Sequence, residues 1–161
     1  MTTTTAVAIA LVAVFVTAAL VVVFVRIAIS HVPWQGVPGL EGTKFYSKSV
    51  PGWRMYGALD LVRQALAANT ALPPAFVDRV ISRLSILVLE GEEWTDSGNR
   101  IGGSSESYLL KVPKSLSSLL HEVLHVIELE MRGEAAHDHE MWLENGFWAA
   151  DSAYRRALGV L

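Results

Sequence analysis

Two histidines four positions apart are the residues of this 161-residue chain with the clearest chemical meaning. His121 and His125 belong to the pentapeptide HEVLH, in which Glu122 follows the first histidine. On a helix of about 3.6 residues per turn, side chains at this spacing project from one face and can bind a single metal ion. Glu122 lies about a quarter turn away, so its carboxylate can contact a water on that metal without being a ligand. The pentapeptide therefore predicts a zinc-dependent hydrolytic site.

A catalytic zinc ion usually has three protein ligands and one position for water. The candidates for the third ligand are His137, His139 and Glu144. On a continuous helix over 138–158, at 100° per residue, the apolar side chains cluster around the direction of His139, and Glu144 falls on the opposite, polar side. The pattern does not determine the direction of His137, which precedes that helix or begins it. We therefore expect His139 to be the third ligand, followed in order by His137 and Glu144.

Two more side chains are candidates for supporting roles. Glu128 follows His125 by three residues and shares its helix face, so its carboxylate could orient an imidazole; a plain surface position is the alternative. Tyr154, or the histidine that does not bind the metal, could stabilise the oxyanion formed during hydrolysis.

The helix that carries HEVLH has recognisable ends. Ser115 is a suitable N-cap, the helix is expected over 116–132, and Gly133 is a suitable C-terminal residue. Its other side chains are apolar almost all round, which is typical of a helix in the centre of a domain. Polar groups buried there without partners would be costly, and a metal ion relieves that cost.

The remaining segments predict an α+β domain. Apolar residues recur at helical spacing in two segments before HEVLH, and two short aliphatic segments are typical of strands. A glycine-rich loop is expected between the strands. The expected order is helix 55–68, helix 74–84, strand 85–90, loop 98–105, strand 108–112, metal-binding helix 116–132 and final helix 138–158.

A long apolar segment precedes this domain. Residues 6–25 contain one polar side chain, Thr17, and at about 1.5 Å per residue they can cross a hydrocarbon core of about 30 Å. A cleaved signal peptide is the alternative, because residues 28–30 resemble a cleavage site. The leader before the segment has no Lys or Arg, however, and the segment exceeds a usual signal-peptide core. We expect a single-pass membrane anchor.

The expected organisation is a transmembrane anchor over 1–29, a Pro- and Gly-rich juxtamembrane linker over 30–53 and the metal-binding domain over 54–161. The nearest basic residues follow the apolar segment, which favours a cytoplasmic position for the domain. The net charge is −3 and no basic run is interleaved with aromatic residues, so nucleic acid is not expected as a partner.

The segment KVPKSLSSLLHEVLH (111–125) resembles the strand, turn and active-site helix of the zincin metallopeptidases, and the resemblance covers about 85–158. The segment HDHEMW (137–142) is similar to the histidine and following aromatic residue that supply a third ligand in SprT-like and related small phage and bacterial metallopeptidases. The resemblance implies a minimal zincin-like domain with one zinc ion per chain. It also implies that His121 and His125 are zinc ligands and Glu122 is the catalytic glutamate.

A second subfamily is also compatible with the residues. Eighteen residues (126–143) separate His125 from Glu144, which is the spacing of thermolysin-like gluzincins. The segment WLENGF (142–147) is similar to an aminopeptidase motif of that class with two residues transposed. The third histidine of the metzincins, six residues after the second, is absent. The choice between a histidine and a glutamate as third ligand therefore stays open.

These patterns predict a membrane-anchored zinc metalloendopeptidase acting on a peptide or protein. A zinc-activated water would attack the peptide bond, with Glu122 as general base, and extended substrate would add to strand 108–112 as an edge strand. The alternative is a catalytically inactive zincin-fold protein, such as a phage accessory protein, that keeps zinc for stability or interaction. An intact Glu122 favours the enzyme.

Overall fold

The structure, a computed structural model, describes residues 13–17, 20, 33–89, 99–101, 108–133 and 139–160. The chain divides into two compact units, Met1–Pro33 and Trp34–Leu161. Most of the predicted anchor over 1–29 lies outside the described residues. In the part of the chain that is described, no helix combines the length and apolar character needed to cross a membrane.

The described residues of the second unit contain a five-stranded mixed sheet. The strand order is β1 (Gln35–Val37), β2 (Leu40–Tyr46), β3 (Ser85–Leu89), β5 (Leu109–Pro113) and β4 (Asn99–Ile101). An antiparallel hairpin of β1 and β2 adds to a parallel core of β2, β3 and β5, and β4 pairs antiparallel with β5 at the other edge.

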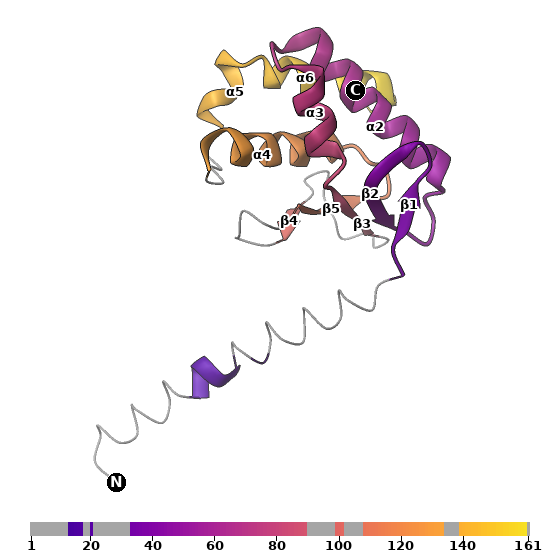
Figure 1. The fold of residues 1–161 in the computed structure, drawn as a ribbon, viewed down its shortest axis with the longest axis vertical. Coiled ribbons are helices and arrows are strands. Elements are labelled where there is room, and N and C mark those ends of the chain that lie inside the picture. Colours follow the sequence, from indigo (N-terminus) through magenta and orange to yellow (C-terminus); the bar gives the residue numbers. More distant parts are fainter. Residues whose placement is uncertain are drawn as a thin grey trace, which may run out of the picture. The chain divides into compact units, whose positions relative to one another are not determined.

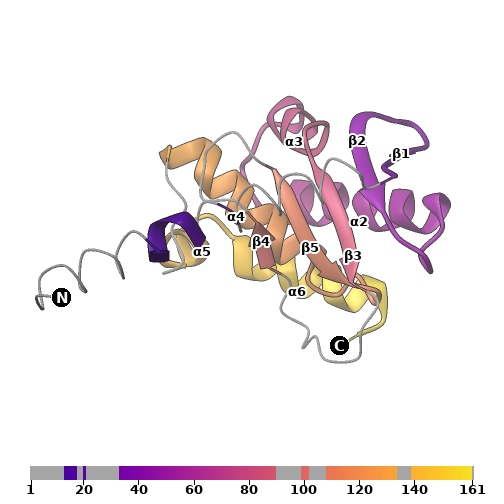
Figure 2. The same ribbon diagram turned by 90° about the horizontal axis from the view of Figure 1, so that it is seen from below.

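The helices of the second unit lie together on one side of this sheet (Figures 1 and 2). They are α2 (Gly52–Asn69), α3 (Pro74–Ile81), α4 (Leu119–Arg132), α5 (Glu140–Glu144) and α6 (Phe147–Leu158). Alternate strand residues form the buried face of the sheet, as the two-residue period of a strand requires. These side chains join one core with the apolar faces of the helices; they include Phe45, Ile86, Val88, Leu110 and Val112.

The predicted α+β class is confirmed, and the elements that carry regular apolar patterns lie where the sequence places them. Helices α2 and α3 and strands β3 and β5 match their predicted segments to within a few residues. Helix α4 ends as expected at Gly133, whose left-handed backbone (φ 78°) suits glycine. Its N–H donates to the Leu129 carbonyl at 2.8 Å.

The predicted linker over 30–53 is wrong, because this segment supplies β1, β2 and the start of α2. Its Pro38 and Gly39 form the turn of the hairpin, where Gly39 has a positive φ of 76°. Phe45 is fully buried in the core, and the Thr43 hydroxyl donates to the Ile81 carbonyl at 2.9 Å. The proline and glycine residues therefore mark a hairpin of the domain rather than a linker.

The predicted loop over 98–105 is wrong at Asn99–Ile101, which form β4 and pair with β5; the rest of that segment lies outside the described residues. The predicted edge position of strand 108–112 is also wrong. Because β5 lies between β3 and β4, its backbone over Leu109–Lys111 is already bonded on both sides and cannot accept an added substrate strand.

Helix α4 begins three residues later than predicted. Leu116 has a positive φ of 63°, which is incompatible with a helix, and Ser118 rather than Ser115 occupies the N-cap position. The buried Tyr154 hydroxyl of α6 donates to the Leu116 carbonyl at 2.7 Å. This bond fastens the turn that precedes α4.

The predicted continuous helix over 138–158 is interrupted. Gly146 has a φ of 73° and separates α5 from α6, and His139 itself has a positive φ of 56° at the N-cap of α5. A Cβ atom at Gly146 would lie 2.0 Å from the Asn69 carbonyl oxygen. Only glycine fits at this turn, because any larger residue would collide with the backbone at the end of α2.

Candidate metal centre

The three histidines that the structure describes come together. His121 and His125 lie on α4, and His139 precedes α5. Each offers a ring nitrogen, and these three atoms lie within 4.8 Å of one another. The ring centroids are 5.0 Å apart for His121 and His125, 5.4 Å for His121 and His139, and 5.0 Å for His125 and His139.

This triangle fits the size of a metal site. Imidazole nitrogens bind zinc at about 2.0–2.1 Å, so three rings around a tetrahedral ion have centroids about 5.2 Å apart. The Nε2 atom of His139 is buried and has no hydrogen-bond partner within the described part of the chain. A buried nitrogen of this kind is costly unless something binds it. The cluster can therefore hold a metal ion, and three imidazoles suit several divalent transition metals.

Glu128 supports one of the three rings. It is fully buried, and its Oε2 lies 3.3 Å from Nδ1 of His125. A carboxylate only accepts hydrogen bonds, so Nδ1 is the donor and Nε2 is left as the nitrogen that could bind a metal ion. Its burial excludes a surface position for Glu128, and its distance from Nδ1 matches the predicted role of orienting the His125 imidazole.

The indole of Trp142 packs against all three histidine rings. This side chain is fully buried, with its ring centroid 4.7 Å from His121, 5.3 Å from His125 and 4.3 Å from His139. The rings of His121 and His139 meet it edge-on, an arrangement that aromatic rings favour. Trp142 therefore restricts how far the imidazoles can turn.

The surroundings of His121 favour the neutral form of its imidazole, which is the form that binds a cation. Burial, and then the neighbouring His139 and Arg155, lower the pKa of His121 to about 4. His121 is consequently neutral near pH 7, as a metal ligand must be. His121 and His139 are half-buried, whereas His125 is buried, so the cluster is reached from solvent on the side of the first two.

Glu122 follows His121 in the first turn of α4, and only 3% of its surface is exposed. Its carboxylate therefore lies in the interior of the domain, on the helix that carries two of the three histidines.

Two other candidates that the structure describes are not part of the cluster. Glu144 is exposed at the end of α5 and is not among the grouped ligands, while His137 lies outside the described residues. Tyr154 is fully buried, its hydroxyl is committed to the Leu116 carbonyl, and burial followed by the nearby Asp151 raises its pKa. Tyr154 thus holds the fold and is not available to a substrate.

The sequence does not predict the position of Trp148. On a continuous helix it would lie about 180° from His139, nine residues earlier. Because the chain turns at Gly146, the Trp148 ring instead lies 5.6 Å from His139 and 4.9 Å from Trp142. The dipeptide Asn145-Gly146, a common turn signal, is the feature that could have indicated the break.

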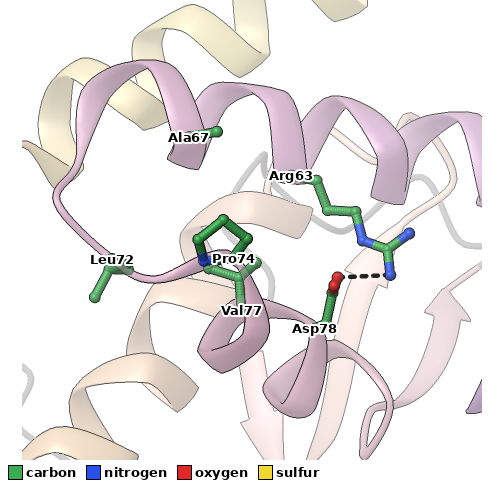
Figure 3. Close-up of a pocket in the computed structure, with 6 residues that line it drawn as sticks. All are labelled: Arg63, Ala67, Leu72, Pro74, Val77 and Asp78. Atoms are coloured by element: carbon green, nitrogen blue, oxygen red, sulfur yellow. Dashed lines mark ion pairs between the residues drawn. The ribbon is translucent and has the colours of Figure 1, made fainter.

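A separate cavity of about 330 Å³ lies between α2 and α3 (Figure 3). Two of its lining residues, Arg63 and Asp78, form an ion pair of 2.8 Å. The rest of its lining is Ala67, Leu72, Pro74 and Val77, so none of the candidate metal ligands contributes to it.

Comparisons with protein-family models, with curated proteins and with solved structures find no match to this chain. The candidate function therefore rests on the geometry of the histidine cluster and on the residues around it.

Proposed function

We propose that the protein is a zinc metallopeptidase with a minimal zincin-like domain. The observation that carries the proposal is the meeting of His121, His125 and His139 within 4.8 Å, with the acidic Glu122 buried on the same helix as two of them. Three protein ligands and one open position are typical of catalytic rather than structural zinc sites.

The residues have distinct roles in this proposal. His121, His125 and His139 would hold the zinc ion, which supplies Lewis acidity and makes water nucleophilic near neutral pH. Glu122 would accept a proton from the attacking water as the C–O bond forms, and would transfer it to the leaving amine as the C–N bond breaks. Glu128 fixes the ring of His125, and Trp142 packs against all three imidazoles.

We also propose that the domain works beside a membrane, on its cytoplasmic side. The apolar segment over 6–25 and the basic residues that follow it support this part of the proposal. The substrate would then be a peptide or protein within reach of a short tether.

The test combines metal analysis with peptide hydrolysis on the purified full chain. We expect one zinc ion per chain, hydrolysis of an unstructured protein substrate, and loss of both in His139→Ala. His137→Ala and Glu144→Ala serve as controls, because the proposal requires neither side chain as a ligand. Loss of zinc in either control but not in His139→Ala would refute the ligand set. Stoichiometric zinc without any hydrolysis would favour an inactive zinc-binding protein.

A further inference from the structure

Trp148 is a large aromatic side chain held at the edge of the histidine cluster. It lies in the first turn of α6, and 46% of its surface is exposed. Its ring nevertheless lies 5.6 Å from His139 and 4.9 Å from Trp142. Part of the indole therefore packs against the rings of His139 and Trp142, and the rest is exposed to solvent.

The two tryptophans differ in what they can do. Trp142 is fully buried against all three imidazoles, so it has no surface left for a ligand. Trp148 continues this aromatic layer outward from His139 and keeps accessible apolar surface. An apolar group that reached the metal from solvent past His139 would cover that surface and gain from its burial.

The position of Trp148 is built into the fold. The backbone of Gly146 packs closely against the Asn69 carbonyl at the end of α2. The approach is so close that a Cβ atom at Gly146 would lie 2.0 Å from that oxygen. Helix α6 then leaves this turn with Phe147 fully buried in the core. Phe147 anchors the helix in the core, and Trp148, about 100° further round the helix, lies at the edge of that core beside Trp142.

The geometry points to Trp148 as the binding surface for an apolar, preferably aromatic, side chain of the ligand held at the histidine cluster. This inference rests on the proposed metal centre and adds its substrate class, a peptide with an apolar side chain beside the bond to be cleaved. An indole face stacks on aromatic rings and repels carboxylates, so acidic side chains would be disfavoured at this position.

The test uses ligands that bind a metal without being cleaved. Acetohydroxamate and 3-phenylpropanohydroxamate carry the same chelating group, and only the second carries an aromatic ring. Their affinities for the zinc-loaded full chain are measured by calorimetry. We expect the aromatic probe to bind at least about tenfold more tightly. In Trp148→Ala that preference should fall below about threefold, with little change for acetohydroxamate.

Two variants control for folding and for non-specific contact. Trp148→Phe should restore most of the preference, because it restores an aromatic surface. Trp53→Ala removes another exposed tryptophan, in α2, and should leave both affinities unchanged. If acetohydroxamate binds but Trp148→Ala keeps the full preference, the role of Trp148 is refuted while the metal centre stands. Failure of the zinc-loaded protein to bind either probe refutes an open position on the metal, and this assignment with it.

Discussion

His125 and Glu128 form a buried pair one turn apart on α4, with Nδ1 of the imidazole 3.3 Å from Oε2 of the carboxylate. The second carboxylate oxygen is buried and has no hydrogen-bond partner within the described part of the chain. A buried carboxylate is costly unless a positive charge or a donor compensates it. A cation bound by His125 would supply that charge through the ring, so the pair links metal binding to the stability of the helix.

Replacing Glu128 should therefore weaken metal binding. Glu128→Gln keeps the shape of the side chain but removes its charge, and partners of this kind typically contribute about 10- to 100-fold in metal affinity. We expect a loss of that size in zinc affinity, measured by competition with a chromogenic chelator. The matched control is Glu144→Gln, at an exposed position of α5, which should leave the affinity unchanged. Equal affinities in both variants would contradict the role of Glu128.

Replacing Glu122 should separate binding from turnover. Glu122→Gln removes the proton acceptor but none of the three imidazoles, so zinc content should be unchanged. Hydrolysis should fall by about 10²- to 10⁴-fold, the usual contribution of a general base. Zinc content by mass spectrometry and initial rates on the same samples check both statements. Full activity in Glu122→Gln would exclude the proposed mechanism.

Local patterns predict the part of the site that lies on one helix. The spacing of His121 and His125 and the apolar residues around them determine the face of α4 without reference to the rest of the chain. His139 also joins the cluster, although not from the continuous helix that the sequence predicts. It is the N-cap of a short helix, and Trp142 packs beside it because it follows within a single turn.

The parts that sequence patterns miss depend on distant contacts. The hairpin of β1 and β2 becomes part of the sheet because β2 pairs with β3, as between Phe45 and Ile86. Three-residue β4 is a strand only because β5 lies beside it. The place of Trp148 depends on how Gly146 meets Asn69 of α2. None of these contacts leaves a periodic signal in its own segment.

The low pKa of His121 predicts acid sensitivity of the metal-free protein. Its pKa is about 4 in the folded chain, against an ordinary value of 6.5. Between these values the unfolded chain takes up a proton that the folded chain does not, so the stabilisation is present above pH 6.5 and is lost as the pH falls through about 4. Urea unfolding of the chelator-treated protein at pH 7 and pH 4.5 should show this loss. His121→Gln should show a smaller difference between the two pH values, and an identical difference would contradict the prediction.

The bond between Tyr154 and the Leu116 carbonyl predicts a structural rather than catalytic role for this tyrosine. Tyr154→Phe removes one of two hydrogen bonds to the Leu116 carbonyl, which still accepts from the Leu119 N–H at 3.1 Å, so the loss should cost about 0.5–1.5 kcal/mol of unfolding free energy. The rate of hydrolysis per folded molecule should be unchanged. Tyr56→Phe, at an exposed position of α2, is the control and should not alter stability. A large loss of hydrolysis in stably folded Tyr154→Phe would restore Tyr154 as a catalytic candidate.

The turn at Gly146 predicts that one added methyl group lowers both the stability of the fold and the affinity for zinc. Gly146→Ala forces a side chain into a left-handed backbone, at a cost of about 1–2 kcal/mol, and adds a clash with the Asn69 carbonyl oxygen. We expect a loss of more than about 2 kcal/mol in unfolding free energy, together with weaker zinc binding, because the same turn orders α5 and His139. Gly57→Ala is the matched control: it lies inside α2 with open space around its Cβ position, and alanine there should stabilise by about 0.5–1 kcal/mol. Denaturant unfolding of the two variants should therefore give opposite signs, and a stable Gly146→Ala with unchanged zinc affinity would show that the turn does not position the site.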